Sequence, residues 1–241
     1  MTTTAYDTHF IASDIAFTDG EDNVHLDVPF RKVKRIKGAV IGMAGCLECM
    51  VDFSNMILNF ILQKSDDFII PATIVDRKDR DFIVMVYING SCIKIQKLRN
   101  SEVKAENITQ IPTVIGSGSK YVQNVINDCP NAVVAVLEAI KHDKYTDGEV
   151  KYCSIRRDDV HNLEAYPMST ELEIQVFGFQ KEVEAANDFL NTQDNQGKVF
   201  QASTEVYHVG TPSPIPLEIG MNFIKQGFFD IKKSLSQECK S

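Results

Sequence analysis

Long hydrophobic runs are missing from this sequence, and their absence argues against a secretory signal peptide and against a membrane-spanning helix. The first apolar run is only Phe10-Ile11-Ala12, which is far too short for the core of a secretory signal peptide. No stretch approaches the roughly 20 apolar residues that a membrane span requires. We therefore expect a cytoplasmic protein without a membrane partner, and we expect its six cysteines to be free thiols.

Basic residues are in deficit. The chain has 25 Lys and Arg against 33 Asp and Glu, which gives a formal net charge of -8. Non-specific binding to nucleic acid depends on Lys and Arg side chains that neutralise phosphates, so we expect no nucleic-acid partner. The 241 residues are 44% hydrophobic, enough to bury a large core without disulfides or a metal.

Motifs for metals and nucleotides are also missing. Cys46 and Cys49 form a Cys-x-x-Cys pair, which could serve redox chemistry or zinc. Zinc would need two further ligands, and no second Cys-x-x-Cys or Cys-x-x-His is present. The five His are scattered, and the glycine spacing of a P-loop is absent. We expect no metal and no cofactor, and we interpret both cysteines as small buried helix residues.

Hydrophobic periodicity and turn residues indicate helices packed on antiparallel sheets. The predicted strands span residues 2–6, 9–14, 33–36, 39–44, 68–75, 82–88, 91–96, 111–115 and 149–155. The predicted helices span residues 46–63, 120–127 and 131–142. Because strands and helices come in groups and do not alternate one by one, the order favours an α+β fold.

A mixed tail follows the last of these strands. It contains a strand candidate at 171–177, a helix at 181–191, a strand at 199–209, a linker at 210–216 and an amphipathic segment at 217–235. We expect a core domain over residues 1–155 and a C-terminal extension over 156–241 that packs on the core or extends it.

The residue after Met1 could carry hydrolytic chemistry. Met1 precedes a small residue, which is the usual substrate for methionine removal. Its loss would leave Thr2 with a free α-amine beside its own hydroxyl. An amine with a pKa near ~8 can accept the hydroxyl proton, so one residue could supply both nucleophile and base.

The opening of the chain resembles that of the proteasome-like subunits of phages and bacteria, which are related to HslV and the proteasome β subunits. Met1-Thr2-Thr3-Thr4-Ala5-Tyr6, followed by Ala12-Ser13-Asp14, is similar to their M-T-T-I-A-Y and A-A-D. Arg31-Lys32-Val33-Lys34-Arg35-Ile36 resembles their K-K-V-x-R-I. The resemblance implies that Asp14 orients Lys32, whose ammonium would lower the pKa of the Thr2 hydroxyl.

Three later segments extend the resemblance in the same order. Ile41-Gly42-Met43-Ala44-Gly45 is similar to I-G-x-A-G, which implies that the Gly45 amide stabilises an oxyanion. Ile115-Gly116-Ser117-Gly118 resembles I-G-S-G, which implies that Ser117 assists proton transfer. His142-Asp143-Lys144-Tyr145-Thr146-Asp147-Gly148 resembles R-D-x-Y-S-G-G. Asp143 would then bond near the threonine amine, Thr146 would replace a serine, and Asp147 departs from the pattern.

The resemblance implies a four-layer αββα N-terminal-nucleophile (Ntn) hydrolase fold and amide hydrolysis through an acyl ester on Thr2, without a cofactor. The implied substrate is a polypeptide or a small amide. A homo-oligomeric ring or stack is implied, and an unfoldase is a candidate partner. Two alternatives stay open, namely a catalytically silent scaffold or interaction protein, with a phage-encoded protein as one option, and a small-molecule amidase.

Overall fold

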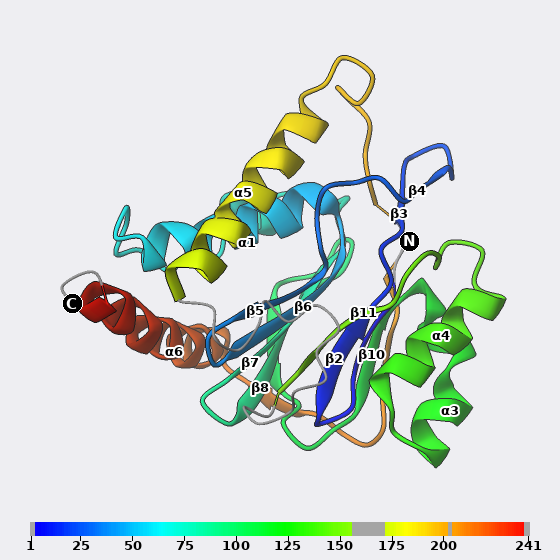
Figure 1. Ribbon diagram of the computed structural model, residues 1–241. Coiled ribbons are helices and arrows are strands. Elements are labelled where there is room, and N and C mark those ends of the chain that lie inside the picture. Colours follow the sequence, from blue (N-terminus) through cyan, green and yellow to red (C-terminus); the bar gives the residue numbers. More distant parts are fainter. Residues whose placement is uncertain (1–2, 156–171, 202–203, 239–241) are drawn as a thin grey trace.

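Two antiparallel sheets lie face to face with helices on both outer sides (Figure 1). This computed structural model describes residues 3–155, 172–201 and 204–238. All pairs between the described strands are antiparallel. The αββα arrangement predicted from the sequence is therefore confirmed. None of the described helices has the length and hydropathy of a membrane span.

The first sheet has the strand order β11-β2-β1-β10-β12. These strands are β1 (Thr3–Tyr6), β2 (Phe10–Ser13), β10 (Thr113–Gly116), β11 (Lys151–Ser154) and β12 (Val206–His208). A short 3-10 helix (Ser117–Tyr121), α3 (Gln123–Asp128) and α4 (Ala132–His142) cover its outer face. Asn131 fixes the start of α4, because its side chain accepts a hydrogen bond from the Val134 amide at 3.0 Å.

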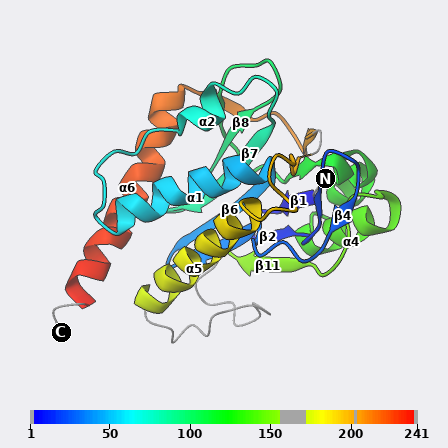
Figure 2. The same ribbon diagram turned by 90° about the horizontal axis from the view of Figure 1, so that it is seen from above.

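The second sheet has the order β13-β9-β8-β7-β6-β5. Its strands are β5 (Val33–Ile36), β6 (Ala39–Gly45), β7 (Phe82–Ile88), β8 (Ser91–Lys97), β9 (Lys104–Asn107) and β13 (Ser213–Ile215). The helices α1 (Leu47–Ile61), α5 (Leu172–Leu190) and α6 (Leu217–Glu238) lie outside it, as the view from above shows (Figure 2). Two short strands, β3 (Phe17–Thr18) and β4 (Val24–His25), form a separate hairpin.

Strand β7 shows how the sequence builds these layers. Its even-numbered residues, from Phe82 to Ile88, pack in the cluster that contains the helices α1, α5 and α6. Ile83 and Met85 pack in the cluster between the two sheets. Side chains alternate between faces with period two, and both faces are buried, so the strand is a continuous apolar run. The turn to β8 uses Asn89 and Gly90, both with positive φ, as a two-residue hairpin requires.

A polar cluster joins the two sheets. Lys94 of β8 forms an ion pair with Glu106 of β9 at 2.6 Å and a hydrogen bond with Nε2 of His208 in β12 at 2.8 Å. Lysine can only donate, so Nε2 accepts and the imidazole proton sits on Nδ1. The Nδ1–H group therefore donates to Thr113 Oγ1 at 2.9 Å, and the Thr113 hydroxyl donates to the Ile111 carbonyl. Burial and the nearby Lys94 lower the pKa of His208 from 6.5 to about 4.

Several predicted elements were wrong. Residues 68–75 are not a strand, because α2 (Ala72–Val75) begins after Pro71. The strand predicted at 171–177 lies almost wholly in α5, whose first residue is Leu172. Within residues 199–209, the described strand is only β12. Strand β13 lies inside the predicted linker, where it pairs with β9.

Candidate active site

A buried ion pair lies beside the start of β1. Lys32 Nζ is 2.9 Å from Asp14 Oδ1, and neither side chain has any exposed surface. Lys32 also donates to the Ala16 carbonyl. Asp14 follows β2 directly, and Lys32 directly precedes β5, so the pair joins the first sheet to the second. Burial lowers the pKa of Lys32, while the charge of Asp14 opposes the loss of its proton.

A second cluster gathers around a different buried carboxylate. Asp143 Oδ2 accepts hydrogen bonds from Ser117 Oγ and, at 2.7 Å, from Thr146 Oγ1. The Tyr145 amide donates to Oδ1 at 3.3 Å. Among the described residues, no basic side chain forms an ion pair with Asp143. Hydroxyl and amide donors alone therefore stabilise the carboxylate in this part of the structure.

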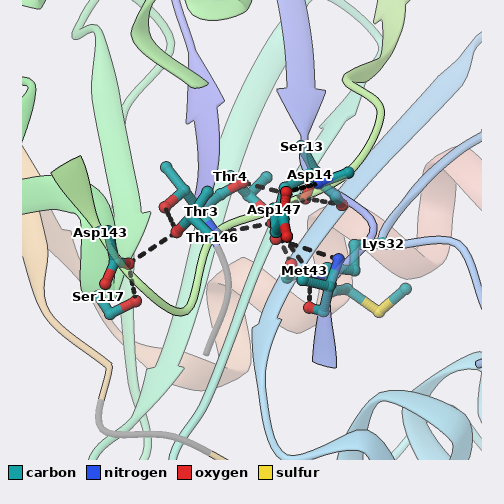
Figure 3. Close-up of polar contacts among 12 residues, drawn as sticks. Thr3, Thr4, Ser13, Asp14, Lys32, Met43, Ser117, Asp143, Thr146 and Asp147 are labelled. Carbon is teal, nitrogen blue, oxygen red and sulfur yellow. Dashed lines mark hydrogen bonds and ion pairs between the residues drawn. The ribbon is translucent and has the colours of Figure 1, made fainter. Parts of the chain in front are cut away.

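Thr3 connects the two clusters, and Figure 3 shows it between them. Its amide donates to Asp14 Oδ1 at 2.9 Å, and its hydroxyl lies 2.8 Å from Thr146 Oγ1. The single proton of the Thr146 hydroxyl is used on Asp143, so Thr3 must be the donor to Thr146. The residue directly after position 2 is thus held from both sides.

Glycines shape the backbone at both clusters. Gly45, at the end of β6, has φ +112°, and a Cβ there would lie 2.2 Å from the Asp81 carbonyl. Gly116, directly before Ser117, has φ +106°. Gly118 leaves room for Thr3, since a Cβ there would lie 2.2 Å from Thr3 Oγ1. These turns require glycine because L side chains rarely adopt such φ values or fit such close contacts.

The first turn of α1 follows Gly45. Cys46 is the N-cap residue, and its side chain makes no capping hydrogen bond. The Cys46 amide donates to the Asp81 carbonyl at 2.8 Å, and the Leu47 amide donates to the Phe200 carbonyl at 3.0 Å. Helix N-termini carry amides without partners inside the helix, and here two distant segments accept from them.

The structure brings most of the predicted site residues together. Asp14 and Lys32 form one cluster, and Ser117, Asp143 and Thr146 form the other. Gly45 ends the strand that leads into α1. Asp147 forms a local contact, in which its Oδ1 accepts a hydrogen bond from the Gly148 amide at 2.6 Å. Thr2 lies outside the described residues.

Sequence reasoning missed two residues of this region, Thr3 and Gly118. Thr3 stood next to the proposed nucleophile without a role of its own, and only the fold reveals its partner Thr146. Gly118 was part of the Gly-Ser-Gly motif, but its function as space for Thr3 depends on a segment more than a hundred positions away. The run Thr2-Thr3-Thr4 is the sequence feature that could have drawn attention to Thr3.

The Cys-x-x-Cys pair packs in the hydrophobic core. Cys46 and Cys49 are free and buried at the start of α1. Within the described ranges, no group of three or more His, Cys, Asp or Glu side chains could hold a metal ion.

No protein-family model and no curated protein sequence matches this chain. Among solved structures, a Gly-1 mutant of Anbu from Hyphomicrobium sp. strain MC1 matches with a TM-score of 0.50 and 14% identity, covering 81% of this chain and 97% of that one. Eukaryotic HslV from Trypanosoma brucei matches with a TM-score of 0.43 and 17% identity, covering 64% of this chain and 97% of that one. The similarity to Anbu and the sheet arrangement place this chain in the fold of the proteasome-like Ntn hydrolases.

Proposed function

We propose that this protein is a threonine-type amide or peptide hydrolase that uses Thr2 after removal of Met1. The observation that carries the proposal is the pair of contacts made by Thr3. Its amide is bound to the carboxylate of the buried Asp14–Lys32 pair, and its hydroxyl reaches Asp143 through Thr146. Two buried carboxylates thus converge on the residue that follows the proposed nucleophile.

In the proposed reaction, the Thr2 hydroxyl attacks the carbonyl carbon of an amide. Its proton passes to the Thr2 α-amine and from there to the leaving nitrogen, while an ester forms between Thr2 and the acyl group. The positive charge of Lys32 would lower the pKa of the attacking hydroxyl. The Gly45 amide would stabilise the negative oxygen of the tetrahedral intermediate. Water then attacks the ester, releases the acid and restores the hydroxyl.

The second cluster suits a partner of the α-amine. A buried carboxylate without a basic side chain is costly unless a cation or several donors approach it. Ser117 and Thr146 donate to Asp143 already, and both hydroxyls can exchange protons with a nearby amine. We assign Ser117, Asp143 and Thr146 to proton transfer and to the orientation of the Thr2 amine.

Intact mass spectrometry before and after incubation with a peptide epoxyketone tests this proposal. That reagent requires both the amine and the hydroxyl of an N-terminal threonine. We expect a mass without Met1 and a single adduct, which Thr2→Ser retains and Thr2→Ala loses.

Each other result has a clear meaning. Retained Met1 in the purified protein would refute the mechanism and favour the scaffold alternative. Loss of Met1 without an adduct would refute peptide hydrolysis by this site. Turnover of small amides by that same protein, with loss of turnover in Thr2→Ala, would then identify a small-molecule amidase.

A further inference from the structure

A buried threonine connects the two sheets near the start of β1. Thr4 has no exposed surface, and its Oγ1 donates a hydrogen bond to the Met43 carbonyl of β6 at 2.8 Å (Figure 3). The same hydroxyl lies 2.9 Å from Oγ of Ser13, which is its partner in the pairing of β1 with β2. The first contact crosses from one sheet to the other, whereas the second stays within the first sheet.

The two sheets approach each other closely at this point because Gly42 has no side chain. A Cβ at Gly42 would lie 2.5 Å from Ile11 Cγ2 and 3.0 Å from Thr4 Cγ2. Glycine within a strand often marks such a close approach by a neighbouring segment. Gly42 thus leaves the space into which Ile11 and Thr4 pack, and the Thr4 hydroxyl reaches the carbonyl of the next residue of β6.

Met43 links Thr4 to two groups of the proposed reaction. The Met43 amide donates to the Lys32 carbonyl at 2.9 Å, and Gly45 follows two positions later at the end of the same strand. A carbonyl in the protein interior needs a hydrogen-bond donor, and Thr4 supplies one to Met43. One hydroxyl therefore ties β1, which begins directly after residue 2, to the strand that ends at the proposed oxyanion group.

The Thr4 hydroxyl has one proton and two acceptors within reach, namely the Met43 carbonyl and Ser13 Oγ. Ser13 Oγ has acceptors of its own, since it lies 3.1 Å from the Thr3 carbonyl and 3.0 Å from the Asp14 carbonyl. Ser13 thus competes with Met43 for the Thr4 proton. Removal of the Ser13 hydroxyl should leave the bond between the sheets in place, whereas removal of the Thr4 hydroxyl breaks it.

We propose that Thr4 is a positioning residue of the hydrolase, because its hydroxyl fixes β6 against β1 and so sets the place of the Gly45 amide. The proposal rests on the function proposed above and assigns no proton transfer to Thr4 itself. Displacement of an oxyanion donor lowers the rate of the chemical step, while the other contacts of a bound molecule stay in place. Loss of the Thr4 hydroxyl should therefore lower the reaction rate without a matching loss of affinity.

Five variants separate the hydroxyl from the rest of the side chain. Thr4→Val removes the hydroxyl and keeps the branched shape, and Thr4→Ser keeps the hydroxyl. Thr4→Ala also lacks the hydroxyl and serves if the added methyl of valine prevents folding. Ser13→Ala removes the competing acceptor. Thr113→Val is the matched control, because Thr113 is a buried threonine at the opposite end of the β1–β10 pairing whose hydroxyl also donates to a backbone carbonyl.

Two measurements are made on each variant. The first is the rate of epoxyketone labelling at increasing reagent concentration, which separates the rate constant at saturation from the half-saturating concentration. The second does not depend on hydrolysis. Protein with 13C at the Ala carbonyls and 15N at Gly gives a single selected amide signal, that of Gly45, because Ala44-Gly45 is the only Ala-Gly pair in the sequence.

We expect Thr4→Val to lower the saturated rate constant about 10- to 100-fold and to change the half-saturating concentration less than about threefold. Thr4→Ser, Ser13→Ala and the Thr113→Val control should keep rates near the native value. The Gly45 amide signal should move in Thr4→Val and return toward its native position in Thr4→Ser.

A native rate constant in folded Thr4→Val or Thr4→Ala protein would overturn the proposal, and so would a Gly45 signal that does not move, or that moves equally in Thr113→Val. Native labelling with an unmoved Gly45 signal would retain the hydrolase and remove Thr4 from its site. No labelling of the native protein, together with a Gly45 signal that moves only on loss of the Thr4 hydroxyl, would refute hydrolysis by Thr2 and leave Thr4 as the residue that positions this turn.

Discussion

Two lysines that are two positions apart have different environments. Lys32 is paired with Asp14 and has no exposed surface. Lys34 is bound to Glu182 of α5, with its ammonium 3.8 Å from the centre of the Phe30 ring. Strand alternation alone places both on one face, the family resemblance selects Lys32 for the site, and the fold shows that Lys34 binds α5 instead. Burial lowers the pKa of both.

The buried pair predicts separable effects on stability and labelling. Lys32→Met leaves the Asp14 carboxylate buried without its cation and should cost about 3–5 kcal/mol of unfolding free energy. The double variant Lys32→Met with Asp14→Asn should recover most of that loss, because no net charge stays buried. Urea unfolding measures both. Epoxyketone labelling should be lost in both, and labelling of the stable double variant would contradict the role of Lys32.

His208 predicts a pH dependence of stability. Its folded pKa, about 4, lies below the ordinary 6.5, so the unfolded chain binds the proton more readily. The contribution is fully present above about pH 6.5 and is lost as the pH falls toward 4. After allowance for partial exposure, we expect a loss of about 2 kcal/mol across this window.

Urea unfolding of native protein and His208→Gln, measured from pH 7 to pH 4, checks this expectation. The free-energy difference between the two proteins should change across the window, since glutamine cannot titrate there. Parallel curves would show that His208 titrates alike in the folded and unfolded chains.

At the scale of elements, strands with two buried faces were predicted well and the surface segments were not. The hairpin of β7 and β8 follows from apolar runs around Asn89-Gly90. Residues 68–75 are similarly apolar, but Pro71 supplies no amide and directly precedes a short helix. Local pattern also could not predict β9 or β13, whose pairing depends on each other and on β8.

The turn between β10 and the 3-10 helix predicts a steric effect. Gly118→Ala would place a Cβ 2.2 Å from Thr3 Oγ1 and 2.7 Å from Ala139 Cβ. Accommodating it should cost about 1–3 kcal/mol and shift Thr3 away from Thr146. Thermal unfolding and epoxyketone labelling measure the two effects. Gly38→Ala is the control, because nothing lies within 4 Å of its added Cβ. Equal stability of the two variants would contradict the packing described here.

At the scale of the whole molecule, the candidate site combines segments from all over the chain. The order of the motifs in the sequence predicted which residues to examine, including Asp14, Lys32 and Asp143. It could not predict which side chains touch, because Thr3 and Thr146 are 143 positions apart. The hydrogen bonds that the Phe200 and Glu205 carbonyls accept from Leu47 and Gly116 were equally hidden, since any residue supplies a backbone carbonyl.

The outer surface predicts self-association. Phe177 on α5 and Ile219 on α6 are each 59% exposed, and Ile69 is 73% exposed. Contiguous apolar patches mark interaction surfaces, whereas single exposed apolar side chains are ordinary, so the test is whether these residues are covered together. We expect sedimentation velocity to show a homo-oligomer that the Phe177→Ser and Ile219→Ser double variant weakens. Tyr121→Ser is the control, at 42% exposure on the opposite helix layer. A native monomer at micromolar concentration would refute this expectation.

Strands β12 and β13 follow each other closely in the chain but complete different sheets, β12 beside β10 and β13 beside β9. Until the ribosome has made β12 and β13, the strands β10 and β9 each have one edge without its partner strand. Open edges pair readily with other chains. In nascent chains of this protein these two edges therefore stay open until residue 215 has been made.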